Sequence, residues 1–417
     1  MATNKSKSTP KAIYSWLHIS DLHCAEDSSY AVAFETLLNG INPSSPKSMK
    51  EGGLRYALIH NPIDCIVITG DIFVKGDVAQ YKKTKKKIEE IYELCSNVCK
   101  WNWKIGEPMD RLFYCPGNHD FTRSTKRTIV KDGKKIEVSR EEINCIYDNG
   151  YFAPCEEHYE LLTTDTFGDI SMIMDGLIEG KEISDLGSRS YEYHIYNAMG
   201  RNNTKVTFCA INTALNAAIM REKKDSDLPA QIRELYQASE EWEREYLKSR
   251  SGNDKITYLK KTIDYCLARV NKKQLNNDKG NLCFISEKAA QEIQDSIQYS
   301  PQQKNNFVIM MGHHPMEYLS KSAQEWMSVL SAKIGAKLYL CGHTHNPSGN
   351  DRIMNNVTEV RIGAFKSYDK DGSYGGFAIG SIVNENQKFT AVIKKWQYIP
   401  THLGEVWIDC ESRHNLS

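Results

Sequence analysis

The sequence has no excess of charge of either sign and no long hydrophobic run. Lysine plus arginine and aspartate plus glutamate number 53 each, so the chain as a whole carries no field that would attract nucleic acid or a membrane surface. No run approaches the ~20 consecutive apolar residues that a membrane span requires. Any binding of a polyanion must therefore depend on a local cluster of basic residues, and we expect no membrane partner.

Signals for secretion and for disulfide chemistry are also missing. The segment MATNKSKSTPK contains basic residues but no apolar stretch, which argues against a secretory signal. The 12 cysteines are scattered, and several, such as Cys209 and Cys341, fall in apolar runs where a free thiol acts as a small hydrophobic group. Cys95 and Cys99 are spaced for one helix face and not as a CxxC pair. We therefore expect a cytoplasmic protein with reduced thiols.

Short, nearly continuous apolar segments recur along the chain and end abruptly in polar residues. Segments of this length suit strands that are buried on both faces. They cover residues 13–20, 64–70, 111–115, 205–211, 306–312 and 337–342. Helical patterns separate several of them, at 30–39, 77–99, 287–297 and 321–334. This alternation predicts a layered α/β fold, and the later segments VRIGAF, GGFAIGSIV and FTAVIKKWQYI predict antiparallel strands that finish the sheets.

Two long stretches interrupt the alternation. With 417 residues the chain is long enough for one core that carries large insertions. Residues 121–204 are polar, partly basic and only weakly periodic, which indicates a first insertion. Residues 222–281 are charged and rich in helix-favouring residues, and we interpret them as a helical insertion that forms a cap. The remaining segments predict one domain over residues 11–400.

Polar residues that can bind metal ions follow five of the predicted strands. The motifs are SDLH with Asp21 and His23, TGD with Asp71, PGNHD with Asn118, His119 and Asp120, GHHP with His313 and His314, and GHTH with His343 and His345. In an open α/β sheet the binding crevice lies at the carboxyl ends of the strands. Any one motif could be an ordinary turn, but five of them at successive strand ends indicate a metal site at one edge.

This ordered set, D-x-H, GD, GNH(D/E), H-x-P and GH-x-H, resembles the calcineurin-like metallophosphoesterase family. The resemblance implies an α/β/β/α sandwich of two mixed sheets flanked by helices, with residues 11–400 as the catalytic domain. It also implies two divalent metal ions with one shared ligand. The first ion would be held by Asp21, His23, Asp71 and His345, and the second by Asp71, Asn118, His313 and His343. Nitrogen and oxygen donors suit Mn²⁺, which we expect, and also Fe²⁺ or Zn²⁺.

The resemblance gives His119 a role that differs from that of the ligands. In the family this position contacts the substrate phosphate, as Asn118 also does, and it can protonate the leaving oxygen. An imidazole with a pKa near 6.5 suits that task. We interpret His18, His314 and Cys24, which adjoin motif residues, as packing or supporting groups.

The residues after Asp71 indicate which branch of the family the chain is similar to. The residue three positions after Asp71 is Val74. At this position purple acid phosphatases carry a metal-binding Tyr, many protein phosphatases carry an Asp, and double-strand-break nucleases often carry a His. The stretch GDIFVKGDVAQYKK is similar to that of small-molecule and cyclic-nucleotide phosphodiesterases, with Gly76 and Tyr81 at matching places. Lys75 is a candidate contact for the substrate phosphate. We therefore expect a phosphodiesterase whose substrate is a nucleotide or another small phosphate ester.

Two alternatives remain open. Residues 123–140 hold seven Lys or Arg and two acids and begin just after the GNHD motif, which suits a nucleic acid backbone and a nuclease activity. The run has no aromatic residues for stacking on bases. A binding scaffold without catalysis is the third reading, and the complete set of ligand types argues against it.

Overall fold

The computed structural model describes a large part of the chain. The described residues are 11–24, 28–39, 53–73, 81–120, 126–131, 134–139, 159–161, 193–214, 217, 287–298, 305–345, 351–354, 356–365, 375–385, 388–401 and 404–416. The predicted helical insertion at 222–281 and the positions Val74, Lys75 and Gly76 lie outside them. The predictions for these segments therefore stay predictions.

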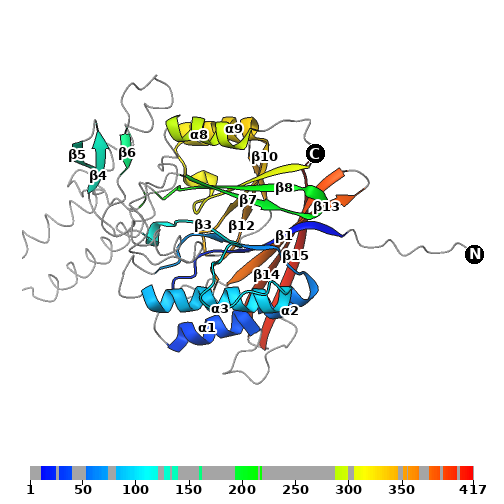
Figure 1. Cartoon of the computed structure of the whole chain (residues 1–417). Helices are drawn as coiled ribbons and strands as arrows, with labels where there is room; N and C mark the ends of the chain where they lie inside the picture. The colour runs from blue at the N-terminus through cyan, green and yellow to red at the C-terminus, as the bar shows by residue number, and fades with distance from the viewer. Residues whose placement is uncertain are drawn as a thin grey trace, which may run out of the picture.

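The first of two six-stranded sheets has the strand order β15-β14-β13-β1-β2-β3. These strands are β1 (Ala12–Ile19), β2 (Cys65–Thr69), β3 (Leu112–Cys115), β13 (Gly376–Glu385), β14 (Lys388–Thr401) and β15 (Gly404–Asn415). β1, β2 and β3 are parallel, and β13, β14 and β15 continue the sheet in antiparallel pairs from β1. One side of this sheet is covered by α1 (Ser28–Asn39), α2 (Gly53–His60) and α3 (Tyr81–Cys99) (Figure 1).

The second six-stranded sheet has the order β11-β12-β10-β9-β8-β7. These strands are β7 (Tyr193–Met199), β8 (Lys205–Ile211), β9 (Asn306–Met311), β10 (Ala336–Cys341), β11 (Arg352–Met354) and β12 (Val357–Arg361). The four inner strands are parallel, and β7 and β11 are antiparallel at the two edges. Its outer side is covered by α8 (Glu287–Ile297) and α9 (Lys321–Ile334), as Figure 1 shows. The predicted sandwich of two mixed sheets flanked by helices is confirmed.

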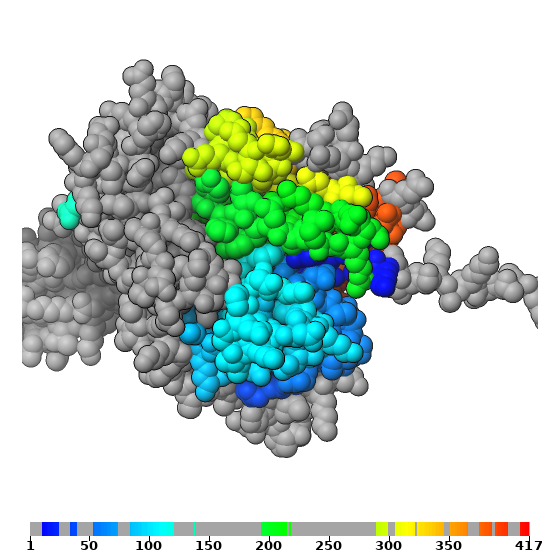
Figure 2. Space-filling model, viewed as in Figure 1, coloured from blue at the N-terminus to red at the C-terminus, as the bar shows by residue number. Residues whose placement is uncertain are grey.

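The core lies between the two sheets and continues under the helices on each side. Trp16 of β1 packs edge-on against Phe208 of β8, with ring centroids 6.0 Å apart. Phe113 of β3 stacks on Tyr196 of β7 at 4.8 Å, and the Tyr196 hydroxyl donates a hydrogen bond to the carbonyl of Tyr114. Strands with both faces buried explain the nearly continuous apolar runs of the sequence. On the outside, β7 and β8 lie between α8 and α3 in the view of Figure 2.

Local signals place α9 where the sequence predicts it. Its N-cap is Ser320, whose side chain accepts a hydrogen bond from the Ala323 N–H, and its C-cap is Gly335 with φ 73°.

One later strand differs from the expectation. The VRIGAF segment overlaps β12, which is parallel to β10 in the second sheet, so the prediction of an antiparallel strand is wrong here. The reason is that β11 takes up the change of direction and pairs antiparallel with β12.

The range assigned to the first insertion contains two kinds of structure. β4 (Lys126–Lys131), β5 (Lys134–Ser139) and β6 (Tyr159–Leu161) form a separate three-stranded sheet, whereas β7 belongs to the second large sheet. The basic run therefore includes the β4–β5 hairpin.

At the other end of the chain, β15 extends the first sheet past residue 400. Across the residues described, no helix is long and apolar enough to cross a membrane.

Candidate metal centre

The motif residues come from strand ends in both sheets. Asp21, Asp71 and Asn118 follow β1, β2 and β3 of the first sheet, and His313 and His343 follow β9 and β10 of the second. Backbone hydrogen bonds join the loops to one another within each sheet. The Asp21 N–H donates to the Gly70 carbonyl at 3.0 Å, and the Gly342 N–H donates to the His313 carbonyl at 3.0 Å. The centre therefore lies where the carboxyl edges of the two sheets meet.

Much of the centre is built on left-handed backbone. Positive φ angles occur at Asp21 (53°), His23 (41°), Asp71 (52°), His343 (69°) and His345 (53°). Side-chain-bearing residues rarely adopt this conformation, and each such residue costs on the order of 1–3 kcal/mol unless its surroundings enforce it. A concentration of backbone strain at one place indicates that the positions of these side chains matter for function.

Two glycines allow the loops to approach one another closely. A Cβ at Gly117 would lie 2.3 Å from the backbone nitrogen and from Oδ1 of Asp71. A Cβ at Gly342 would lie 1.8 Å from Ser20 Oγ and 2.6 Å from Asp21 Oδ2. Neither contact is compatible with a side chain, so glycine in PGNHD and in GHTH is required by the packing of the centre itself.

The first predicted ligand set is brought together as a unit. One ligating atom each of Asp21, His23, Asp71 and His345 lies within 4.8 Å of all the others. The Nε2 atoms of His23 and His345 are 3.0 Å apart, and Asp71 Oδ2 lies 3.7 Å from His23 Nε2. His23 Nδ1 donates to the Phe73 carbonyl at 3.3 Å, which leaves the lone pair of Nε2 facing the group. Burial is the main cause that lowers the pKa of His23 to about 4, so this ring is neutral at pH 7.

Asp21 provides a direct test of whether a cation fits there. Its Oδ2 accepts the His343 N–H at 2.9 Å, but its Oδ1 is buried without a hydrogen-bond partner, and the nearby His345 Nε2 is 3.4 Å away. A buried carboxylate oxygen without a partner costs free energy. Burial raises the pKa of Asp21, but the proximity of His345 and the charge of His313 lower it more, so the carboxylate is ionised. A divalent cation would satisfy this oxygen.

The second predicted ligand set surrounds His313 Nε2. Asn118 Oδ1 lies 3.1 Å from this nitrogen, and Asp71 Oδ2 and His343 Nδ1 each lie 3.2 Å from it. His313 Nδ1 donates to the Thr69 carbonyl at 2.7 Å, so in the neutral ring Nε2 would present a lone pair to its neighbours. Burial lowers the pKa of His313, but the charge of Asp71 outweighs it and raises the pKa to about 9. A positive charge is needed here, and either a proton or a metal ion can supply it.

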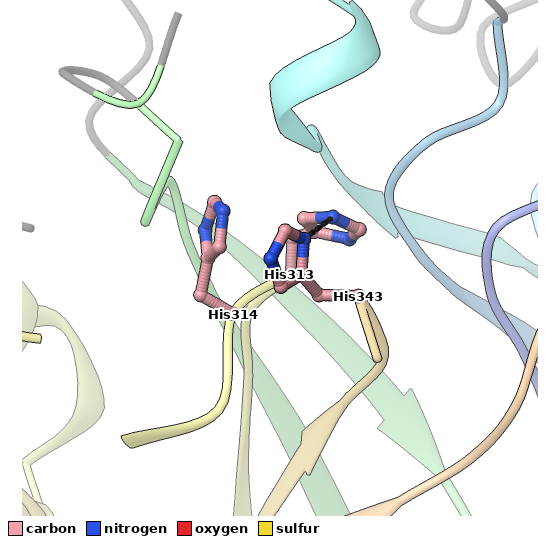
Figure 3. A group of neighbouring side chains, drawn as sticks. All are labelled: His313, His314 and His343. Atoms are coloured by element: carbon pink, nitrogen blue, oxygen red, sulfur yellow. Dashed lines mark hydrogen bonds between the residues drawn. The ribbon is translucent and has the colours of Figure 1, made fainter. Parts of the chain in front are cut away.

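His314 lies beside this set and is held by other contacts. Its ring, with those of His313 and His343, forms a group that could hold a metal ion. Figure 3 draws the hydrogen bond between His313 and His343, and the His314 ring lies beside them, with its centroid 4.4 Å from that of His343. Thr213 Oγ1 accepts the His314 N–H at 3.1 Å and lies 3.1 Å from its Nδ1, and the His314 carbonyl accepts from the Tyr339 hydroxyl at 2.6 Å. These contacts suit the supporting role that we predict for His314.

Asp71 connects the two sets and also positions His119. Its Oδ2 takes part in both sets, while its Oδ1 accepts the His119 N–H at 2.8 Å. Burial raises the pKa of Asp71, but the charges of His313 and His119 lower it well below its usual range. The His119 ring stands perpendicular to that of His23 at 4.8 Å and is partly exposed. The structure thus brings His119 to the site at a place that substrate can reach.

Asp120 is a site residue to which the sequence reasoning gave no role. Its Oδ2 accepts the Gly117 N–H at 2.8 Å and its Oδ1 accepts the Phe73 N–H at 3.0 Å, so one carboxylate joins the loops that follow β2 and β3. Burial and the charge of Asp71 raise the pKa of Asp120 to about 7. A buried acid that closes a short turn by bonding its own backbone is a recognisable local signal. Its contact with Phe73 is not visible in the sequence.

The prediction that Cys24 packs in the core agrees with its burial there.

This geometry agrees with the result of comparing the chain with known families. Residues 15–210 match the calcineurin-like phosphoesterase family. The resemblance to this family that the sequence motifs indicate is confirmed over this range. The matched part of the chain includes Asp21, His23, Asp71, Asn118 and His119, while His313, His343 and His345, which complete the proposed sets, follow it. This match supports the hydrolysis of a phosphate ester and a divalent metal site as the general chemistry of the protein.

The similarities to individual proteins are distant. A comparison with curated protein sequences gives no match. One similar solved structure is a single mutant of Vps29 from Entamoeba histolytica, with 10% identity, 29% of this chain and 89% of that chain covered and a TM-score of 0.16. Another is the sulfate thiohydrolase SoxB from Thermus thermophilus, with 11% identity and a TM-score of 0.27. That match covers 90% of this chain and 55% of the SoxB chain.

Proposed function

We propose that this protein is a dinuclear metal-dependent phosphodiesterase that hydrolyses a nucleotide or another small phosphate ester. The observation that carries the proposal is the position of Asp71 Oδ2, which lies 3.7 Å from His23 Nε2 of one ligand set and 3.2 Å from His313 Nε2 of the other. One atom can therefore serve both sets. The proposed ligands are Asp21, His23, Asp71 and His345 for one ion, and Asp71, Asn118, His313 and His343 for the other. Mn²⁺ is the proposed ion, with Fe²⁺ or Zn²⁺ as substitutes that accept the same donors.

Two bound divalent ions would supply Lewis acidity and a water of lowered pKa for attack on phosphorus. The side chains of the protein contribute the remaining functions. Asp21 and Asp71 keep their negative charge at neutral pH because of their neighbours, and so can offset the charge of the ions. His119 is fixed through its backbone to Asp71 and keeps its ring at the partly exposed side, where we propose that it donates a proton to the leaving oxygen.

The proposal of a small substrate rests on the residues that follow Asp71. The stretch from Gly70 to Tyr81 is similar to that of small-molecule and cyclic-nucleotide phosphodiesterases, and Tyr81 is the first residue of α3. Lys75 would add a positive charge for the phosphate. The metal ligands recognise any phosphoryl group, so selectivity must come from surfaces around them, and the two predicted insertions are the candidates.

A nuclease is the second candidate function, and the β4–β5 hairpin favours it. Lys131 pairs with Lys134 and Val130 with Lys135 across the hairpin, which begins seven residues after His119. A basic hairpin so near the catalytic motif could contact a nucleic acid backbone. Turnover of the purified protein with Mn²⁺ distinguishes the candidates. The substrates are a chromogenic diester, a chromogenic monoester, cyclic nucleotides, and single- and double-stranded DNA.

We expect the small diesters to be hydrolysed fastest. Faster cleavage of DNA would favour the nuclease, and no turnover of any of these esters would contradict the proposal. The hairpin is tested by replacing its Lys and Arg residues with Gln. In a nuclease, DNA cleavage and its salt dependence should fall while hydrolysis of the small diester is unchanged. The control variant is Lys394→Gln with Arg413→Gln, which removes one half-buried basic side chain from β14 and one exposed basic side chain from β15.

A further inference from the structure

β12 carries two charged residues inside a fully buried strand. Glu359 is 0% exposed and Arg361 is 6% exposed, and their spacing of two puts both on one face of the sheet. The Arg361 Nε–H donates to Glu359 Oε1. A buried ion pair is weak support for stability, because removing both charges from water costs about as much as the pair regains. The pair therefore calls for a reason other than stability.

The pair contacts the short 3-10 turn η6 (Met316–Tyr318) at two places, the backbone N–H of Met316 and the side chain of Glu317. Glu359 Oε2 accepts the Met316 N–H at 2.6 Å. The second residue of the pair, Arg361, donates from Nη1 to Glu317 Oε1 at 3.1 Å. Glu359 thus uses both of its oxygens, one on Arg361 and the other on the first backbone N–H of the turn.

The turn lies next to both histidines of the second ligand set. It follows His313, His314 and Pro315 directly in the chain. The Tyr318 ring stands perpendicular to the His343 ring, with centroids 4.6 Å apart. A displacement of the turn would therefore move the loop of His313 and remove a packing partner of His343. By contrast, the backbone N–H groups of Asp21 and His23 donate to carbonyls of the loop after β2.

We propose that Glu359 is a positioning residue for the second metal ion. Its carboxylate fixes the Met316 amide, and through the turn it fixes the spacing of His313 and His343, without touching the ion or the substrate. The inference rests on the proposed dinuclear function. Substitution of a residue that orients metal ligands typically lowers metal affinity or activity by about 10–100-fold.

The test uses Glu359→Gln in the full-length protein. Glutamine keeps the shape of glutamate but has one acceptor oxygen in place of two. Its NH₂ group therefore meets either the Arg361 Nε–H or the Met316 N–H, donor against donor, and one of the two contacts is lost. Titration with Mn²⁺ should show wild-type affinity for the first ion and about 10–100-fold weaker binding of the second. The spin-coupled dinuclear signal in electron paramagnetic resonance should be lost at two equivalents. In the metal-free protein, amide hydrogen exchange over residues 313–318 should become faster.

The matched control is Asp64→Asn. The Asp64 carboxylate accepts the Ser15 N–H at 2.8 Å before β2 begins, at the opposite end of the parallel strands from the centre. This variant should leave both metal affinities and the exchange of residues 313–318 unchanged. If Glu359→Gln does not fold, the double variant Glu359→Leu with Arg361→Met removes both charges together and still lacks the acceptor for the Met316 N–H.

Each outcome is decisive. Unchanged binding of the second ion in a folded variant overturns the role of Glu359, and so does equal weakening of both ions. If the wild-type protein binds fewer than two ions, the proposed function fails instead. In that case the exchange of residues 313–318 decides by itself whether Glu359 holds the turn, and unchanged exchange contradicts the inference.

Discussion

The two halves of the centre share Asp71 but are held in different ways. In the first half, Asp21 and His23 have left-handed backbone and are fixed by hydrogen bonds from their own backbone N–H groups to the loop after β2. In the second half, His343 shares the left-handed backbone but His313 does not, and the loop of His313 is held by the Gly342 N–H and also by side chains, among them Thr213 and Glu359. Backbone contacts between neighbouring loops support both halves, and buried polar side chains give the loop of His313 further support.

Two histidines, one from each half, differ in their exposure to solvent. The His345 side chain of the first half is 27% exposed, whereas that of His313 in the second is 0% exposed. Water can replace a lost partner near the surface but not in the interior, where an unpaired polar group stays costly. The surroundings of His313 should therefore be more sensitive than those of His345 to changes in residues that do not touch a metal ion.

Asp71→Ala should have the largest effect, because Asp71 is the one proposed ligand that both halves share. We expect loss of both ions and activity near background with every substrate. Elemental analysis and turnover of the folded variant measure this. His345→Ala is the comparison, and it should weaken only the first ion. Retention of two tightly bound ions in Asp71→Ala would show that the shared position of Oδ2 is not a bridge.

His119→Ala should lower turnover without removing metal from either half. Loss of a general acid typically costs about 10²–10⁴-fold, and substrates with better leaving groups should lose less because they need no proton. Turnover of a series of aryl esters, together with metal analysis, measures both expectations. Metal loss in this variant would place His119 among the ligands, and equal losses across the series would argue against proton donation.

Asp120→Asn should weaken the centre by about 10–100-fold in metal affinity or activity, as is typical for residues that orient ligands. An asparagine NH₂ would face either the Gly117 N–H or the Phe73 N–H, so one link between the loops after β2 and β3 is lost. Asp110→Asn is the control. Asp110 accepts a hydrogen bond from the Tyr92 hydroxyl and precedes β3, so it lies at the opposite end of that strand from Asn118. If both variants have equal and small effects, the Asp120 link does not position the ligands.

The halves should also differ in the protons that they release on binding metal. The pKa of His313 is raised to about 9, so its ring is protonated at pH 7 and must lose that proton before Nε2 can bind an ion. The pKa of His23 is lowered to about 4, so this ring is already neutral. Affinity for the second ion should therefore rise with pH up to about 9, with release of up to about one proton per ion at pH 7.

Calorimetry in buffers of different ionisation enthalpy measures this release for each ion separately. His23 should contribute no proton when the first ion binds at pH 7. Equal proton release for both ions, or a second-ion affinity that does not change between pH 6 and pH 9, would contradict the assigned charge of His313.

The residues of the candidate site could be recognised from the sequence because each signal is local. A buried strand that ends in a polar motif is visible in a few residues, and parallel strands present such ends at one edge. The seven proposed ligands and His119 could therefore be predicted to lie near one another, as the structure now places them. The helix at 321–334 could be delimited in the same way, because the cap residues Ser320 and Gly335 adjoin it.

Contacts between distant segments could not be predicted in this way. Glu359 reaches Met316 across 43 positions, and Asp120 reaches Phe73 across 47. An acid and an arginine two positions apart inside an apolar strand, as in VTEVR, do signal a buried pair on one face. That signal leaves the partner of the pair unknown.

By itself the sequence determined the layered α/β class, the strand ends and the residue types of the centre, since periodicity and capping act over a few neighbouring residues. Only the tertiary structure decided that β12 lies parallel to β10, that the two sheets meet at Asp71, and that a buried carboxylate at Glu359 holds a turn beside the second ligand set. Strand partners and buried polar contacts depend on which distant segments share the interior. Burial there leaves each polar group with only the partners that the fold provides.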